Sequence, residues 1–210
     1  MYVPRHFEMS DDDARDLLHH HGAGDLITHT ADAGLVATLL PFIYDPVPGP
    51  CGTLHGHLAR ANDHWRHPIV GEAMVILRGP DAYVSPSWYA SKREHGRVVP
   101  TWNYVTAHVY GTLVVRDETD YVRWVVEKLT EKHEAASERP WSVGDAPGQF
   151  IDGQLRAIVG LELRITRIEA KAKVSQNRSP ADIEGVLLGL RRGGAGAMAD
   201  EVEARAGGAE

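Results

Sequence analysis

Several features are scarce in this sequence of 210 residues. Cys51 is the only cysteine, so the chain cannot form an internal disulfide, and no set of cysteines marks a metal site. No apolar run approaches the roughly 18 residues that span a bilayer. The N-terminal segment MYVPRHFEMSDDD lacks the apolar core of a signal peptide. We therefore expect a cytoplasmic protein that makes no membrane contact.

Common catalytic motifs are missing as well. The sequence has no Gly-x-Ser-x-Gly segment, no P-loop and no Gly-x-Gly-x-x-Gly after a strand. It therefore nominates no catalytic residue. The net charge of −7 argues against a broad nucleic-acid surface, and no helix-turn-helix pair is recognisable. DNA is a partner that neither charge nor motif supports.

Apolar residues alternate along several segments, which predicts strands rather than long helices. Hairpin-like connections outnumber helical crossovers, which favours a mainly β, largely antiparallel barrel with peripheral helices. We expect one domain over residues 1–190 and a mobile, Gly/Ala/Glu-rich tail, with or without some helix, over residues 191–210. The expected strands cover residues 25–30, 34–44, 54–62, 72–89 (as two strands joined at Gly79-Pro80), 102–115 and 158–171. Helices are expected after Ser10, over 117–133 and after Ser179.

The segment VPTWNYVTAHVYG, residues 99–111, is an unusual strand. Trp102, Tyr104, Thr106, His108 and Tyr110 share one face, because alternate residues of a strand point to opposite sides. The opposite face carries Val105, Ala107 and Val109. The ring-rich face is either the outer surface of a sheet or the lining of a site for a flat, polar ligand.

Five short segments carry candidate chemistry. In His55-Gly56-His57 the two imidazoles share one side of a strand, so they either bind a metal with a third ligand or make packing and cofactor contacts; we expect no metal. In HLARAN, Arg60 suits a phosphate and Asn62 offers further donors, although a surface carboxylate would also pair with Arg60.

SPSWY (85–89) and TWNY (101–104) combine hydroxyl, Trp and Tyr groups that can stack on a flat ring or anchor a small core. KAKVSQNRS (171–179) is a basic stretch that is either solvated or holds a phosphate, in the same subunit or in a neighbour.

Together these segments resemble a known family. MYVPRHF, GHLARAN, AYVSPSWY, VPTWNYVTAHVYG and KVSQNRSPADIEGVLLGL occur in the order found in the PaiB-type FMN-binding negative transcriptional regulators. The resemblance spans most of residues 1–190. It implies an FMN-binding split β-barrel that forms a homodimer, with the flavin in a groove at the subunit interface.

The resemblance also implies a set of flavin contacts. Leu39 and Leu40 would approach the isoalloxazine ring, and Val105, Val109 and Leu113 would fill the barrel. The segment of His57, Arg60, Ala61 and Asn62 would meet the ribityl chain and phosphate. Trp88, Trp102 and Asn103 would lie on the outer side of the ring, and the partner subunit would supply Lys173, Gln176 and Asn177.

Three functions follow as alternatives. The first is a flavin-binding negative transcriptional regulator that acts through its flavin or through a partner. The second is a flavin-dependent oxidoreductase on the pyridoxamine-phosphate-oxidase-like fold, in which the flavin supplies the redox chemistry. The third is a metal or haem protein that uses the histidines.

Overall fold

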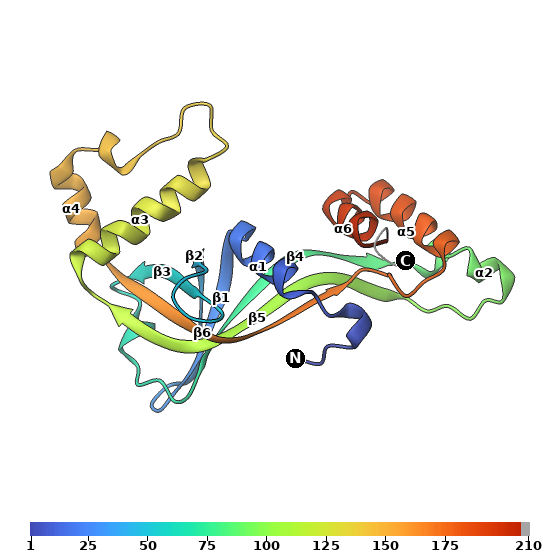
Figure 1. Cartoon of the computed structure of the whole chain (residues 1–210), viewed down its shortest axis with the longest axis horizontal. Helices are drawn as coiled ribbons and strands as arrows, with labels where there is room; N and C mark the ends of the chain where they lie inside the picture. The colour runs from blue at the N-terminus through green and yellow to red at the C-terminus, as the bar shows by residue number, and fades with distance from the viewer. Residues whose placement is uncertain (207–210) are drawn as a thin grey trace. The chain divides into compact units, whose positions relative to one another are not determined.

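The computed structural model describes residues 1–206. Within them, six strands form a closed barrel in the order β1-β2-β3-β6-β5-β4 (Figure 1). The pairs β1–β2, β1–β4, β2–β3 and β3–β6 are all antiparallel. This confirms the predicted mainly β, largely antiparallel split barrel. The strands are β1 (Ala23–Thr30), β2 (Gly34–Asp45), β3 (Thr53–Ala59), β4 (Ala73–Val84), β5 (Thr101–Arg116) and β6 (Ile158–Lys173).

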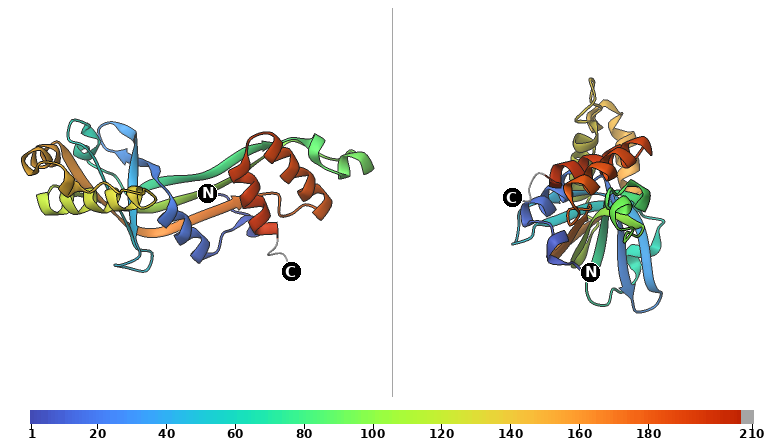
Figure 2. Two further views of the ribbon diagram at one scale, coloured as in Figure 1. Left: turned by 90° about the horizontal axis from the view of Figure 1, so that it is seen from above. Right: turned by 90° about the vertical axis from the view of Figure 1, so that its right-hand side faces the viewer.

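Helices accompany the strands as peripheral elements (Figures 1 and 2). They are α1 (Asp11–His20), α2 (Ser91–Glu94), α3 (Thr119–Glu134), α4 (Gly148–Arg156), α5 (Pro180–Arg192) and α6 (Gly196–Ala206). Single 3-10 turns are η1 (Arg5–Phe7), η2 (Asp63–Arg66), η3 (Pro86–Trp88) and η4 (Val143–Asp145). The hydroxyls of Ser10 and Ser179 accept backbone N–H bonds at the starts of α1 and α5, as their sequence positions predict. None of the helices within residues 1–206 combines the length and apolarity needed to cross a membrane.

The described residues group into two compact units. Unit 1 holds residues 1–14, 78–107 and 169–206, and unit 2 holds residues 15–77 and 108–168. The boundaries fall inside α1, β4, β5 and β6, so one helix and three strands contribute to both units. The assignment of one domain to residues 1–190 stays a prediction, and the two units are described separately below.

The strand patterns account for the buried side chains. Along β6, Val159, Leu161, Leu163 and Ile165 are buried, as their alternation predicts. Along β5, Val105, Ala107 and Val109 are buried as well, whereas the ring-rich face is exposed or half-buried. Leu113 is only half-buried, so it fills the core less than the resemblance implies. Local alternation therefore predicts the buried face of each of these two strands for most of its length.

The β1–β2 hairpin forms where the sequence places it. Gly34 adopts a φ of +72°, which a side chain would disfavour, and it pairs with Thr30 across the turn. The Thr30 hydroxyl donates to the Gly34 carbonyl at 3.0 Å and accepts from the Ala33 amide at 3.1 Å. The turn is thus closed by side-chain as well as backbone bonds.

The prediction of two strands joined at Gly79-Pro80 is wrong. β4 runs without a break from Ala73 to Val84. Proline is compatible with extended backbone and costs a strand only its missing N–H. Gly79 has a close neighbour: a Cβ built there would lie 2.9 Å from the Val105 side chain. The glycine therefore permits close strand packing rather than a turn.

The C-terminal segment differs from the predicted mobile tail. Helix α5 extends to Arg192, and residues 196–206 form α6, which packs against α5 (Figure 1). Met198, Ala199 and Val202 are buried, and Arg205 pairs with Asp13 at 3.2 Å. These contacts arise from tertiary packing, which the glycine-rich composition did not reveal. Residues 207–210 lie outside the described part.

Candidate functional site

Strand β3 and the loop after it hold the largest group of predicted site residues. Leu54 and Leu58 are buried on one face, while His55 and His57 point to the other, which α3 covers. Gly56 lies opposite Phe42 on β2, and a Cβ there would be 3.0 Å from the Phe42 ring. In this unit, Gly56 therefore allows β2 to approach closely.

His55 is fixed by an aromatic cluster from α3. Its Nδ1 lies 2.8 Å from the Tyr121 hydroxyl, which in turn donates to the Leu161 carbonyl at 3.0 Å. The Trp124 ring meets the imidazole edge-on, with centroids 4.8 Å apart. Because Tyr121 donates to Leu161, Nδ1 carries the proton and Nε2 is left as an acceptor. Nε2 is buried and has no hydrogen-bond partner within residues 1–206.

His57 is half-buried on the same side of the strand. Its Nδ1 is buried and likewise meets no hydrogen-bond partner in the part of the chain that the structure describes. Burial lowers the pKa of His57, and it is the largest cause of the lowered pKa of His55. Both imidazoles are therefore neutral at pH 7. An unpaired, buried ring nitrogen is a position at which a bound ligand would gain a hydrogen bond.

Arg60 is held by several partners of unit 2. Its Nη1 donates to the Asp117 carboxylate at 2.9 Å, and Nη2 contacts the other carboxylate oxygen. Its Nε donates to the Arg156 carbonyl at 2.8 Å, and Nη2 also donates to the Ile158 carbonyl at 3.0 Å. The pair raises the pKa of Arg60 and lowers that of Asp117. Four of the five N–H groups are used, so a phosphate would have to displace Asp117 to receive a bidentate contact.

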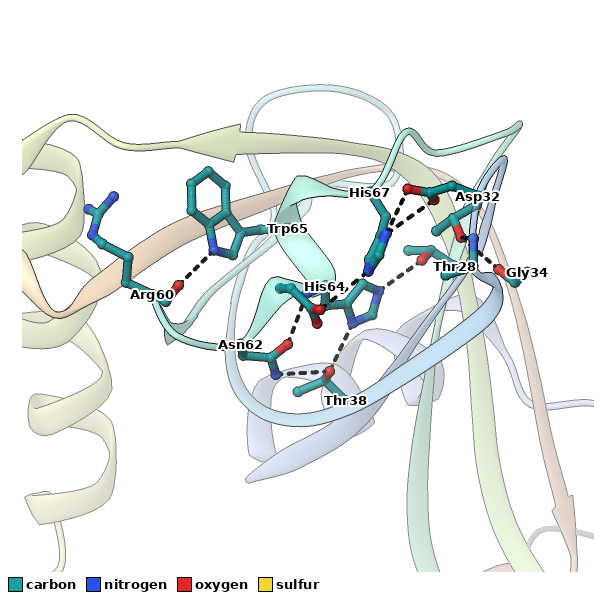
Figure 3. Close-up of polar contacts among 12 residues, drawn as sticks. Thr28, Asp32, Gly34, Thr38, Arg60, Asn62, His64, Trp65 and His67 are labelled. Carbon is teal, nitrogen blue, oxygen red and sulfur yellow. Dashed lines mark hydrogen bonds and ion pairs between the residues drawn. The ribbon is translucent and has the colours of Figure 1, made fainter.

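The loop after Arg60 is held by a network around the buried His64 (Figure 3). The His64 ring lies 2.8 Å from the hydroxyls of both Thr28 and Thr38. The Asn62 side chain accepts from the His64 amide at 3.0 Å and donates to the Thr38 hydroxyl at 3.3 Å. The Trp65 indole donates to the Arg60 carbonyl at 3.2 Å. Ala61 is exposed at the tip of this preorganised loop.

Sequence reasoning missed this network, because it assigned residues 63–68 only to a helical turn or a loop. An Asn followed by a short polar stretch is a signal for a capped turn at Asn62. No sequence pattern, however, indicates that His64 and two threonines from other strands meet inside the unit.

Strand β2 carries the predicted ring contacts Leu39 and Leu40. Leu40 is 5% exposed and packs inside, whereas Leu39 is 66% exposed. Leu39 belongs to a face of unit 2, here called the outer face, that the register of β1, β2 and β4 brings together; it also holds Asp25, opposite Leu39 and Ile76, and His29, opposite Leu35. Its apolar members are Ile27, Leu35, Ala37, Leu39, Met74 and Ile76.

Unit 1 holds the other predicted site residues. Lys173 contacts the Thr101 hydroxyl and donates to the Trp102 carbonyl at 3.0 Å, and burial is the largest cause of its lowered pKa. Asn103 is buried and exchanges hydrogen bonds with the Ser175 hydroxyl at 3.0 and 3.2 Å.

The remaining members of this set differ in exposure. Gln176 closes its own turn by bonds to Ala172 and Val174, and Asn177 is exposed. The Trp102 indole donates to Asp81 at 2.8 Å. Trp88, the last residue of η3, packs against helix α5.

The predicted set is thus divided equally between the units. Unit 2 holds Leu39, Leu40, His57, Arg60, Ala61 and Asn62, and unit 1 holds Trp88, Trp102, Asn103, Lys173, Gln176 and Asn177. Their assignment as flavin contacts stays a prediction. Across residues 1–206, no group of three or more His, Cys, Asp or Glu side chains is placed to hold a metal ion.

Residues 1–167 match the protein family described as "Putative FMN-binding domain". The chain belongs to this FMN-binding domain family. The prediction of FMN as the cofactor is confirmed at the level of the family, and so is the resemblance that the sequence motifs carry. The matched range includes all six predicted contacts of unit 2, and it ends before Lys173, Gln176 and Asn177.

A relative of known sequence and two solved structures are also similar to this chain. The chain is 30% identical over 198 residues to the "Protease synthase and sporulation protein PAI 2" of Bacillus subtilis, covering 91% of this chain and 89% of that protein. Among solved structures, the conserved hypothetical protein Rv2991 of Mycobacterium tuberculosis aligns with a TM-score of 0.58 at 12% identity, over 85% of this chain and 94% of that chain. The FAD and heme binding protein of Mycobacterium smegmatis aligns with a TM-score of 0.53 at 18% identity, over 78% and 71%. At these low identities the two structures are evidence for the fold only. Their fold agrees with the split barrel described above.

Proposed function

We propose that this chain binds FMN as a homodimer and acts as a negative transcriptional regulator through its flavin or through a partner. The observation that carries the proposal is the neutral His57, whose buried Nδ1 has no partner within residues 1–206, on the strand that leads into the preorganised 60–65 loop. The family membership names the ligand that would use it.

The donor set of unit 2 fits a flavin in part. His57 offers a neutral ring nitrogen, the loop after β3 offers backbone amides around Ala61, and Leu39 offers an exposed apolar surface for a planar ring. Arg60 would reach the phosphate only after it releases Asp117. When bound, FMN supplies one- and two-electron redox chemistry, and the residues named here bind and orient it.

The homodimer is argued from the outer face of unit 2. Leu35 and Leu39 are 77% and 66% exposed in a single chain, beside the half-buried Ile27, Met74 and Ile76. Exposed apolar residues that gather on one face mark an interaction surface, here with Asp25 and His29 among them, and a two-fold dimer would cover the same face on both copies. The partner copy would then supply its Lys173, Gln176 and Asn177 to the flavin.

The dimer has a direct test. Leu39→Asp places a carboxylate in the outer face and is expected to yield monomers in size-exclusion chromatography with light scattering. Leu188→Asp, at a 51% exposed leucine of unit 1, is the matched control and is expected to keep the dimer. A wild-type chain that is monomeric at all concentrations, or a Leu39→Asp variant that still dimerises, would contradict the proposed interface.

The regulatory half rests on the PAI 2 relative and on the family resemblance. Direct DNA binding has little support, because the net charge is −7 and α6 carries Asp200, Glu201 and Glu203 against Arg205. An indirect route through the flavin or a partner protein is consistent with this charge. Unchanged transcript levels after deletion of the gene would overturn this half.

The test of flavin binding is an absorption spectrum of the purified protein followed by fluorescence titration with FMN. We expect saturation at about one FMN per chain. His57→Leu is expected to weaken binding by about 5- to 100-fold, since it removes one hydrogen bond in a buried site. His133→Leu, at an exposed histidine of α3, is the control. A protein that shows no flavin absorption and no saturable fluorescence change with FMN would refute the proposal.

The alternative is a flavin-dependent oxidoreductase on the same fold. The fold shared with the FAD and heme binding protein is compatible with it. Its discriminating observation is consumption of a nicotinamide or deazaflavin donor by the FMN-loaded protein. Oxidation no faster than with free FMN would exclude this alternative for the donors tried.

A further inference from the structure

A pocket lies in unit 1, and its lining includes none of the unit 2 residues assigned to the flavin. It has a volume of about 480 Å³ and lies between the segment 87–93 and helix α5. We call it the Trp88 pocket. Its lining residues are Ser87, Trp88, Arg93, Gly185, Leu188, Gly189, Arg192 and Gly193.

Glycines of α5 create this pocket. Gly185, Gly189 and Gly193 recur every four residues and so lie along one side of the helix. A Cβ at Gly185 would be 1.9 Å from the Trp88 carbonyl oxygen, and one at Gly189 would be 2.2 Å from a carbon of the Trp88 indole ring. The indole therefore lies directly on the helix. A larger residue at either position would displace the indole, so these two glycines are what allows Trp88 to pack against α5.

The charges at the pocket all have one sign. Arg93 and Arg192 are exposed, and neither guanidinium group has a hydrogen-bond or ion-pair partner in the described part of the chain. No carboxylate is among the lining residues. Lys92 adds a third cation nearby, because its Nζ donates to the Ser87 hydroxyl at 3.1 Å.

Two of the nearby acidic groups, Asp182 and Glu203, have partners of their own. Asp182 accepts from the amide and hydroxyl of Ser91 at 2.9 and 2.8 Å. Glu203 accepts from Arg191 at 2.6 Å, so Arg191, although it precedes Arg192, is not part of the pocket's positive charge. Glu94 and Glu184 are adjacent in sequence to the lining residues Arg93 and Gly185, and within residues 1–206 no ion pair joins either carboxylate to the two guanidinium groups of the pocket.

We propose that the Trp88 pocket binds a planar ring that carries a phosphate group, as a site separate from the flavin site. The indole of Trp88 and the exposed side chain of Leu188 supply an apolar surface on which a ring packs. Arg93 and Arg192 supply planar forks that suit a phosphate, which carries more charge than a carboxylate. This assigns Trp88, one of the predicted flavin contacts, to a different ligand.

The test uses adenosine 5′-monophosphate as the probe, with adenosine and inorganic phosphate as the separate halves of the ligand. Binding to the full chain is measured by calorimetry and by quenching of tryptophan fluorescence, with and without saturating FMN. We expect the nucleotide to bind in both conditions, more tightly than either half, and less tightly as salt is added because the arginines are exposed.

The charge dependence is tested with Arg93→Gln/Arg192→Gln. This double variant is expected to lose at least about tenfold in nucleotide affinity, since two charged contacts are removed, while its FMN affinity is unchanged. Arg5→Gln/Arg97→Gln removes the same charge from exposed positions of the same unit and is the matched control.

Three results would overturn the proposal: no nucleotide binding, equal loss in both double variants, or displacement of the nucleotide by FMN. Displacement by FMN would mean that the Trp88 pocket is part of the flavin site. Because FMN affinity is measured separately, failure of the nucleotide site and failure of flavin binding are distinguishable.

Discussion

Replacement of Thr28 by valine should destabilise unit 2 although it removes no volume. Thr28 and His64 are each 1% exposed, and the Thr28 hydroxyl lies 2.8 Å from Nε2 of the imidazole. Valine keeps the shape of threonine but leaves that ring nitrogen without a partner in a buried position. A lost partner of this kind costs about 1–3 kcal/mol. We therefore expect the free energy of unfolding to fall by about 1–3 kcal/mol.

The assay is urea unfolding followed by far-UV circular dichroism. With a slope of about 2–3 kcal/mol/M, the expected loss lowers the midpoint by about 0.3–1.5 M. Thr112→Val, at an exposed threonine of β5, is the control and should change the free energy by less than about 0.5 kcal/mol.

A double-mutant cycle isolates the interaction. In a His64→Leu background no ring nitrogen remains to be left unpaired, so Thr28→Val should cost little there. If Thr28→Val behaves like Thr112→Val, or costs the same in both backgrounds, then the Thr28–His64 contact does not stabilise the loop as inferred here.

The remaining predictions concern the groups around β3. Because burial lowers the pKa of His55, its stabilising contribution is present above about pH 6.5 and is lost as the pH falls through its folded pKa. Wild type should therefore lose stability relative to His55→Leu between pH 7 and 5, and parallel curves would contradict this. Tyr121→Phe leaves Nδ1 of His55 unpaired and should cost about 1–3 kcal/mol in urea unfolding, whereas an unchanged midpoint would mean that the hydroxyl contributes nothing. Asp117→Ala releases the guanidinium of Arg60 and should raise FMN affinity several-fold in fluorescence titration; unchanged affinity would remove Arg60 from the flavin site.

Much of the local structure follows from the sequence. Alternation along residues 102–115 and 158–171 predicts two long strands and most of their buried faces, because the period of side-chain direction in a strand depends only on the backbone. Ser10 and Ser179 mark helix starts for an equally local reason, since a cap bonds to amides of its own first turn. The family motifs likewise identify FMN as the cofactor from short segments.

Partner choice is what only the tertiary structure decides. Arg60 was predicted to hold a phosphate or to pair with a surface carboxylate, and in the structure it pairs with Asp117, which lies 57 residues away in the chain; the phosphate contact stays a prediction. Glu162 of β6 is only 8% exposed, and Arg116 and Arg164 hold its carboxylate at 2.6 and 2.7 Å, although Arg116 lies on another strand and 46 residues away in the chain.

The C-terminal helices make the same point. Composition predicted a mobile tail, whereas α6 packs on α5 and buries Met198 and Val202. By helix propensity alone, Gly185 and Gly189 would only weaken a helix. In the fold they leave room for Trp88 to pack against α5. Sequence alone determines periodicity, caps and family motifs, since these depend on neighbours along the chain. Which charges meet, and which glycines make room for an aromatic ring, depends on segments that only folding brings together.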